Sequence, residues 1–267
     1  MERIRLDVLM EEKGLVESRS QAQRLIMAGQ VRVAGQVVLK SSTKFLQQSE
    51  ITIDQPPPFV SRGGEKLLGA LEAFDLLDVS GRVCADIGSS TGGFTDCLLQ
   101  HGAAKVYAVD VGYGITHWKL RNDPRVVVME RTNARYVTGF PEPISLITID
   151  ASFISLRLFL PIFKVWFGET PAEVVALIKP QFEAGRKETA RGDGVIRDVL
   201  VHQKVLTEVL TAAENEGYTI TGLIRSPLLG PKGNTEFLVH LQIPFQKVKD
   251  LDEWIAPLFP LDVEKLQ

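Results

Sequence analysis

The sequence contains few of the residues that build disulfide-stapled or metal-binding proteins. It has two cysteines, Cys84 and Cys97, and four histidines, and none of them follows the spacing of a metal site. Two cysteines also provide no disulfide framework, which is typical of proteins in a reducing compartment. We therefore expect no bound metal, and a cytoplasmic location.

Long apolar runs are lacking as well. The most apolar stretch, Leu156–Phe167, is interrupted by Arg157, Pro161 and Lys164 and is too short to span a bilayer. The first residues, MERIRLDVLMEEKG, mix charged and apolar side chains at once, unlike the apolar core of a signal peptide. These patterns predict no export signal and no membrane partner.

Excess charge of either sign is also absent. The net charge is −3, so any binding of nucleic acid must come from local basic patches. With 45% hydrophobic and 24% charged residues, the composition is that of an ordinary globular protein. A length of 267 residues is enough for one α/β domain and a smaller module.

Three consecutive prolines, Pro56 to Pro58, divide the chain into two parts of different character. Such a run forms a stiff extended spacer, which favours separate domains. We predict a small domain over residues 1–54, a linker over 55–62 and a larger domain over 63–245. Residues 246–267 form an acidic tail, for which we predict a helix packed on the larger domain.

The small domain has an α+β pattern. Leu6, Leu9 and Met10 recur at helical spacing, and Ser18 or Ser20 is a suitable N-cap for a second helix. Short β-rich pieces follow at 31–33, 36–39 and 51–53. Four basic residues are candidate phosphate contacts, although charge alone fits a solvated surface equally well: Arg19, Arg24, Arg32 and Lys40.

The order of residues in this part adds information that charge does not. The segment RLDVLMEEKGLVESRSQAQRLIMAGQVRVAGQVV resembles the S-four-type RNA-binding module. The matching features are the SR start of the second helix, the apolar spacing through RLIMAG and the strand turn VRVAGQVV. The resemblance implies RNA binding, with Arg19, Arg24 and Arg32 as the best contact candidates.

In the larger domain, apolar strands alternate with helices. Strands are expected at 83–88, 105–110, 126–130, 144–150 and 173–180, with a helix at 199–217 and two further strands near the C-terminus. This alternation predicts an α/β fold, a doubly wound and mainly parallel sheet with helices on both faces. A final antiparallel strand is compatible with such a sheet.

A glycine-rich turn, DIGSSTGGF, follows the first strand of this domain. It predicts a ligand site, because ligands of open α/β sheets lie beyond the carboxyl ends of the strands. Asp110 ends the second strand, where a carboxylate can accept hydrogen bonds from ribose hydroxyls. The spacing differs from GxGxxG and from GxxxxGK[ST], so S-adenosylmethionine fits better than a dinucleotide or a nucleoside triphosphate. The candidate cofactor residues in the turn are Gly88, Ser89, Ser90, Thr91, Gly92, Gly93 and Phe94.

Four charged residues stand at element ends where they could converge over the donor. Asp150 and Lys179 end two strands, and Glu236 begins the last strand. Lys66 stands just before the first helix of the domain, after Gly63 and Gly64, which we expect to form the bend that leads out of the proline spacer. Methylation of a ribose hydroxyl requires removal of a proton whose pKa is far above neutral, and a lysine can accept it only where burial or a neighbouring cation favours its neutral form. A solvated strand terminus is the ordinary alternative for each lysine.

The motifs RGGEKL, GSSTGGF, DVGYG, RTNAR, DASFIS, KPQFE and GNTEF, in this order, resemble the TlyA family of ribosomal RNA methyltransferases related to FtsJ. The resemblance implies a Rossmann-like methyltransferase fold, S-adenosylmethionine as cofactor, and cytidine 2′-O-methylation of ribosomal RNA. It also implies a catalytic tetrad in which Lys179 is the base, Asp150 holds it, and Lys66 and Glu236 set the field and the ribose position.

The same resemblance places Asp110 at the donor ribose, Asn133 near the adenine and Asp150 at the edge of the donor site. Asn133 stands where FtsJ relatives commonly have an acidic residue. The expected partner is ribosomal RNA or a ribosomal subunit, and no obligate protein partner is evident.

Other interpretations remain open at this point. Members of this family are also called haemolysins, but no amphipathic membrane helix is apparent. A catalytically inactive RNA-binding protein and a methyltransferase for proteins or small molecules are further alternatives. Residues 183–198 are rich in glycine and basic residues, and form either a loop that orders over RNA or a plain connector.

Overall fold

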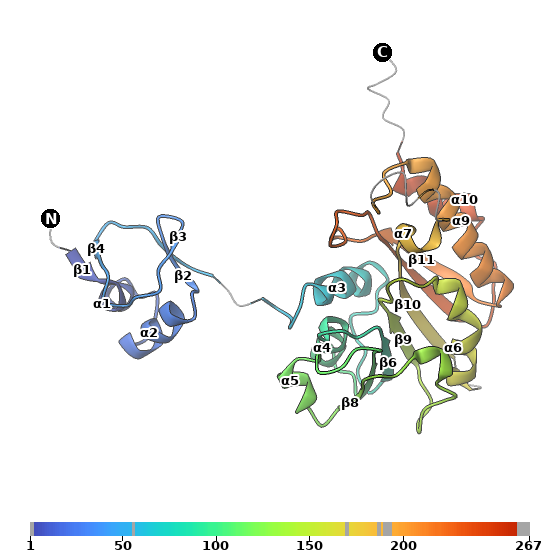
Figure 1. Cartoon of the computed structure of the whole chain (residues 1–267), viewed down its shortest axis with the longest axis horizontal. Helices are drawn as coiled ribbons and strands as arrows, with labels where there is room; N and C mark the ends of the chain where they lie inside the picture. Colours follow the sequence, from blue (N-terminus) through green and yellow to red (C-terminus); the bar gives the residue numbers. More distant parts are fainter. Residues whose placement is uncertain (1–2, 55–56, 169–170, 186–187, 189–193, 261–267) are drawn as a thin grey trace, which may run out of the picture. The chain divides into compact units, whose positions relative to one another are not determined.

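A computed structural model describes residues 3–54, 57–168, 171–185, 188 and 194–260. The chain divides into two compact units, Met1–Pro57 and Pro58–Gln267 (Figure 1). Each unit has its own apolar core.

The first unit is a small α+β fold. A three-stranded antiparallel sheet has the order β3-β2-β5, and a second pair joins β1 to β4. The elements are β1 (Arg3–Arg5), α1 (Leu6–Glu12), α2 (Arg19–Met27), β2 (Val31–Val33), β3 (Gln36–Val37), β4 (Lys44–Leu46) and β5 (Ile51–Ile53).

The apolar spacing of the two helices explains this core. Leu6 and Met10 of α1 and Ala22 and Ile26 of α2 are fully buried against β2. Ser18 caps α2, since its hydroxyl accepts a hydrogen bond from the Gln21 amide at 3.3 Å. The strand predicted at 36–39 is shorter than expected and ends at Val37.

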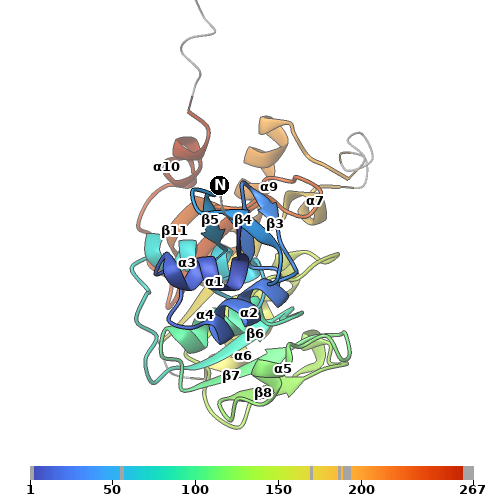
Figure 2. The same ribbon diagram turned by 90° about the vertical axis from the view of Figure 1, so that its left-hand side faces the viewer.

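The second unit is built on a seven-stranded sheet of order β11-β12-β10-β9-β6-β7-β8. Strands β10, β9, β6, β7 and β8 pair in parallel, and β12 pairs antiparallel with both neighbours. The strands are β6 (Val83–Ile87), β7 (Lys105–Val109), β8 (Val126–Met129), β9 (Leu146–Ile149), β10 (Ala172–Ile178), β11 (Thr219–Arg225) and β12 (Phe237–Ile243). Figure 2 shows β6, β7 and β8 in succession, with α5 beside β8.

Helices cover both faces of this sheet, as Figure 1 shows. The helices α3 and α4 form one core with Leu146 and Val175, whereas α6 and α9 form the other with Ile147 and Val174. Neighbouring residues of one strand thus point into opposite cores. The helices are α3 (Gly63–Ala73), α4 (Gly93–Gln100), α5 (Trp118–Arg121), α6 (Leu160–Phe167), α7 (Pro180–Glu183), α9 (Val199–Asn215) and α10 (Leu251–Ile255), with short 3-10 turns η1 (Ala134–Tyr136), η2 (Leu156–Leu158) and η3 (Ala256–Leu258).

This arrangement confirms the predicted fold class, a doubly wound and mainly parallel sheet with one antiparallel strand. The antiparallel strand is β12, which lies between β10 and β11 and not at the edge of the sheet. The turns after β6, β7, β9 and β10 therefore meet at one edge, where a ligand site is expected.

The start of the second unit differs in detail from the expectation for Lys66. Phe59 is already buried in this unit, and the Val60 amide donates to Asp96 at 2.9 Å. Gly63 and Gly64 begin α3 and do not form a bend before it, so Lys66 lies in the first turn of the helix. A Cβ on Gly64 would stand 2.2 Å from the Phe59 ring, so this close contact requires glycine.

The tail contributes α10 and η3, and Ile255 packs into the core. Residues 261–267, and residues 186–187 and 189–193 of the predicted loop at 183–198, lie outside the described residues. Among the helices that the structure describes, none combines the length and the apolarity needed to cross a membrane.

Candidate active site

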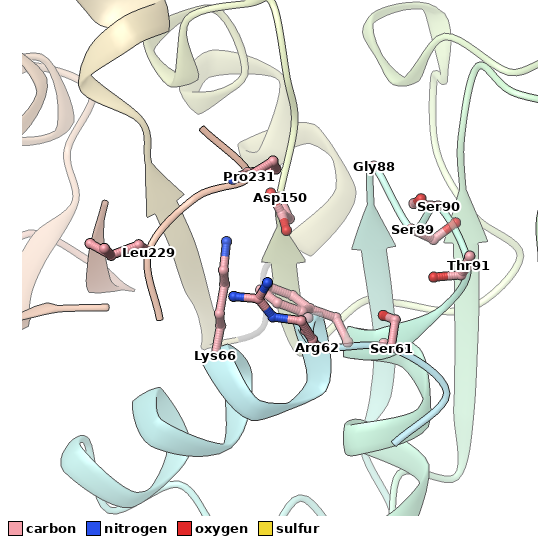
Figure 3. A pocket seen from close by; sticks show the side chains of 13 residues that line it. Ser61, Arg62, Lys66, Gly88, Ser89, Ser90, Thr91, Asp150, Leu229 and Pro231 are labelled. Atoms are coloured by element: carbon pink, nitrogen blue, oxygen red, sulfur yellow. The ribbon is translucent and has the colours of Figure 1, made fainter. Parts of the chain in front are cut away.

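A cavity of about 400 Å³ lies at the carboxyl end of the sheet in the second unit. Figure 3 shows that α3, the turn after β6, the end of β9 and the loop before β12 all contribute to it. Its size falls within the range of small-molecule sites in proteins. The lining residues are Ser61, Arg62, Gly63, Lys66, Gly88, Ser89, Ser90, Thr91, Gly93, Phe94, Asp150, Leu229 and Pro231.

The predicted glycine-rich turn forms one wall of the cavity. Gly88 has a φ of +77°, and a Cβ there would stand 2.8 Å from the Asp150 carbonyl oxygen. A side chain at Gly93 would stand 2.7 Å from the Gly64 amide nitrogen. These contacts explain why the turn requires glycine: its backbone lies directly against the end of β9 and the start of α3.

The polar groups around this wall fit an adenosine-bearing ligand. Ser89 is buried, and its hydroxyl has no hydrogen-bond partner among the described residues, so it is available to a ligand. The Asp110 carboxylate accepts hydrogen bonds from the Ser90 amide at 2.8 Å and the Gly112 amide at 2.7 Å. Each carboxylate oxygen keeps a free lone-pair direction for a ribose hydroxyl.

Neither Asp110 nor Asn133 is part of the lining of the cavity, but Asp110 accepts a hydrogen bond from the lining residue Ser90. The Thr132 amide donates to the Asp110 carbonyl at 2.9 Å, which places the two loops side by side. The Asn133 side-chain oxygen caps η1 by accepting from the Arg135 amide at 3.0 Å. That hydrogen bond orients the Asn133 carboxamide and leaves its NH₂ group as a donor.

The four predicted catalytic residues form two ion pairs. Lys66 Nζ lies 2.5 Å from Glu236 Oε2, and Lys179 Nζ lies 2.5 Å from Asp150 Oδ1. Both lysine side chains are 9% exposed and that of Glu236 is 0% exposed, so the Lys66–Glu236 pair is almost fully removed from water. Lys66 and Asp150 line the same cavity, with the Lys66 amine directed toward the end of β9 (Figure 3).

Several residues that the sequence did not single out support these pairs. The Ser152 hydroxyl accepts a hydrogen bond from Lys179 at 2.8 Å. The Gln181 amide donates to Glu236 Oε1 at 3.4 Å. Ser152 and Gln181 stand within the motifs DASFIS and KPQFE, so the motifs themselves were a signal, whereas Leu229 and Pro231 reach the cavity through sheet order, which no local pattern reveals.

A buried carboxyl group, Asp86, lies beneath the glycine-rich turn. Burial raises the pKa of Asp86 to about 7, against the opposing effect of hydrogen bonds from the Thr95 and Thr148 hydroxyls. The nearby charge of Asp150 raises it further. Asp86, which accepts a hydrogen bond from Thr95 at the start of α4, is therefore a group with a pKa near neutral close to the wall of the cavity.

In the first unit, the predicted RNA contacts differ in how they are paired. Arg24 and Lys40 are exposed. Arg32 forms an ion pair with Asp54 at 2.8 Å, and Arg19 lies 3.6 Å from the buried Asp7. Arg32 and Arg19 are therefore partly neutralised, and Arg24 and Lys40 are the more available cations.

Comparison with known proteins agrees with this architecture. Residues 59–243 match the model of the FtsJ-like methyltransferases, and residues 4–51 match the S4 domain. A Bacillus subtilis protein described as "Putative rRNA methyltransferase YqxC" is 49% identical, over 90% of this chain and 86% of that protein. The "16S/23S rRNA (cytidine-2'-O)-methyltransferase TlyA" of Mycobacterium tuberculosis is 46% identical, over 90% of each chain.

A solved structure described as "Putative hemolysin from Streptococcus thermophilus" has a TM-score of 0.71 and 43% identity, and the match covers 97% of this chain and 96% of that one. This similarity extends over both units, and the family model covers most of the second. The chain therefore belongs to the FtsJ-like methyltransferases, and among them to the TlyA family, whose methyltransferase domain follows an S4 domain.

Proposed function

We propose that this protein transfers the methyl group of S-adenosylmethionine to the 2′-hydroxyl of a cytidine in ribosomal RNA, with the RNA presented in a ribosomal subunit. The relatives named above as rRNA methyltransferases support the reaction and the substrate class. An S4 domain on the same chain supports an RNA substrate.

The observation that carries the proposal is the Lys179–Asp150 ion pair at the carboxyl ends of β10 and β9, beside the cavity. S-adenosylmethionine supplies an electrophilic methyl group on a positively charged sulfur. Gly88 and Gly93 bring the backbone close to this donor, while Ser89 and Asp110 offer hydrogen-bonding groups to it.

Lys179 is the proposed base. Its neutral amine accepts the proton of the ribose 2′-hydroxyl as the oxygen attacks the methyl carbon, and the carbon–sulfur bond breaks as the new carbon–oxygen bond forms. Asp150 and Ser152 hold Nζ in place and stabilise the ammonium that results.

Lys66 and Glu236 have a supporting role in this scheme. The Lys66 amine enters the cavity and is held by Glu236, which is itself buried. Lys66 can therefore donate a hydrogen bond to the ribose or to the 2′-oxygen as negative charge develops there. Arg62 lines the same wall and is a further cation close to where RNA phosphate would enter.

Methyl transfer from labelled S-adenosylmethionine tests the proposal. Unmodified ribosomal RNA, isolated subunits and assembled ribosomes serve as substrates, and Lys179→Met is compared with wild type. Lys204→Met is the matched control, because Lys204 is exposed and pairs with Glu208, and neither residue lines the cavity.

We expect the wild type and Lys204→Met to label a subunit at a cytidine ribose and Lys179→Met to lose about three orders of magnitude in rate, the middle of the range for general-base catalysis. Absence of labelling in every RNA substrate would refute the function. Full activity of Lys179→Met would refute the proposed base but not the reaction.

A further inference from the structure

The two segments that carry the Lys179–Asp150 pair contact each other at their start, in their middle and at their far ends. Residues 150–156 follow β9, and residues 179–183 follow the adjacent strand β10. Asp150 pairs with Lys179 at the start, the rings of Phe153 and Phe182 lie 4.9 Å apart in the middle, and a further hydrogen bond joins the far ends. The contact at the far ends is made by Glu183.

Glu183 is a buried carboxylate, with its side chain 3% exposed. Its Oε2 accepts a hydrogen bond from the Ser155 hydroxyl at 2.6 Å, and its Oε1 accepts one from the Leu156 amide at 2.6 Å. Arg157 Nε lies 3.4 Å from Oε2 and supplies the opposite charge. Short, charge-assisted hydrogen bonds between buried groups hold the residues that they join in a fixed geometry.

The bonds made by Glu183 connect directly to the backbone of Lys179. The amides of Phe182 and Glu183 donate to the Lys179 carbonyl at 2.9 and 3.3 Å, so α7 is a single turn over Pro180–Glu183 with Lys179 at its N-cap. Glu183 therefore attaches the turn that follows Lys179 to the loop that starts at Asp150.

The loop on the Asp150 side needs such an attachment. Its first residue is held by the Asp150 amide, which donates to the Ile87 carbonyl at 2.9 Å. Within the loop Phe153 adopts a φ of +64°, a left-handed conformation that is unfavourable for an aromatic residue and persists only where neighbouring contacts hold it. Glu183 supplies that contact at the other end of the loop, through Ser155 and Leu156.

From this geometry we infer that Glu183 is a positioning residue for methyl transfer, which keeps Lys179 and Asp150 in register by joining the segments that carry them. The inference rests on the proposed function. Glu183 is absent from the lining of the 400 Å³ cavity, so it acts through the pair and not on the donor. Glu183 and Lys179 both line a smaller cavity of about 10 Å³, so the two residues lie close to each other.

The test compares Glu183→Gln and Ser155→Ala with wild type and with Glu208→Gln. Glu208 is a matched control, because it contacts the same Arg157, at 3.3 Å, from a more exposed position and has no bond to the 150–156 segment. For each protein kcat and KM for RNA, the Kd of S-adenosylmethionine and the melting temperature are measured. Amide hydrogen exchange at Leu156 reports on the attachment itself and does not depend on activity.

A positioning role predicts that Glu183→Gln lowers kcat by about tenfold to a hundredfold, the effect of a misplacement near 1 Å, while the Kd of S-adenosylmethionine stays within about twofold. Ser155→Ala also lowers kcat, whereas Ser155→Thr, which keeps the hydroxyl, has a kcat close to that of wild type. The double variant loses less than the sum of the two single losses, since both substitutions remove the Ser155–Glu183 bond. Glu208→Gln resembles wild type.

A kcat for Glu183→Gln within about twofold of wild type would overturn the inference, and so would a parallel loss of donor affinity, which indicates general damage to the fold. If Glu183→Gln does not fold, Ser155→Ala and Ser155→Thr decide the question by the same criteria. If the wild type methylates no RNA, the proposed function fails. In that case, faster amide hydrogen exchange at Leu156 in Glu183→Gln would still show that Glu183 holds the 150–156 segment. Unchanged exchange at Leu156 would refute this attachment.

Discussion

The Lys66–Glu236 pair allows stability and catalysis to be separated by substitution. Lys66→Met keeps the length of the side chain and removes its charge, leaving Glu236 buried with only the 3.4 Å hydrogen bond from Gln181 among its described contacts. Removal of one partner of a buried ion pair costs about 3–5 kcal/mol, because an uncompensated charge remains. The pair qualifies as buried, since the side chains are 9% and 0% exposed.

For a unit of this size, 3–5 kcal/mol corresponds to a decrease of about 10 °C in melting temperature, near the middle of the expected range. The second variant, Lys66→Met combined with Glu236→Gln, has no buried charge left. We expect it to recover most of the lost stability, as replacement of whole buried pairs by neutral residues commonly does.

The two variants should differ in stability but not in activity. Thermal and urea unfolding measure the first property, and methyl transfer to ribosomal RNA at a temperature where all proteins are folded measures the second. Both variants should be strongly impaired in methyl transfer, because neither presents the Lys66 amine to the cavity. If Lys66→Met lowered the free energy of unfolding by less than about 1 kcal/mol, as expected for an exposed ion pair, the stability argument would be refuted. An active double variant would refute the catalytic role of Lys66.

Three further predictions concern other parts of the molecule. Asp110→Ala removes the acceptor of two backbone amides, so the Kd of S-adenosylmethionine measured by calorimetry should rise about tenfold or more. Burial raises the pKa of Asp86 from 3.8 to about 7, so its contribution to stability is full below pH 4 and is lost as pH rises toward 7. The free energy of unfolding in urea should therefore fall by at most about 4 kcal/mol over this pH range, and Asp86→Asn should abolish the pH dependence. Arg24→Ala and Lys40→Ala should each weaken RNA binding and lower the slope of log K against log salt by about 1 in filter-binding titrations, and Arg32→Ala should have a smaller effect because Asp54 already neutralises it.

The pairing of Asp150 with Lys179 was accessible from the sequence. Both residues end strongly apolar runs, and parallel strands present their carboxyl ends at one edge of a sheet. The sequence did not reveal which strands are neighbours, but β9 and β10 are consecutive in the chain, and consecutive strands are often adjacent. The structure places them side by side, and the two charged ends meet.

The partnership of Lys66 with Glu236 was not accessible in the same way. It joins residues 170 positions apart and depends on β12 inserting antiparallel between β10 and β11. No local pattern in the chain specifies that insertion. The three-residue strand β1 was also missed, since a segment this short has no measurable period and is defined only by its pairing with β4.

The glycines before Lys66 misled the sequence interpretation for an instructive reason. Two consecutive glycines have poor helix propensity and therefore indicated a bend. Their role is instead close approach: Gly64 packs on Phe59, and the Gly64 amide lies where a Cβ of Gly93 would stand, at 2.7 Å. Tertiary contact outweighed local propensity, so the helix begins at Gly63.

This close approach links two parts of the site that have separate chemical roles. Gly93 begins α4 at the wall of the cavity formed by the glycine-rich turn, and Gly64 lies in the first turn of α3, two residues before Lys66. Because the helices touch backbone to backbone at these glycines, the contact that shapes this turn also fixes the position of Lys66 at the cavity. The Lys66 amine is then held from the far side by Glu236. The glycine-rich wall of the cavity and the Lys66 amine thus belong to one packed unit, which explains why a glycine pair precedes Lys66 with only Glu65 between them.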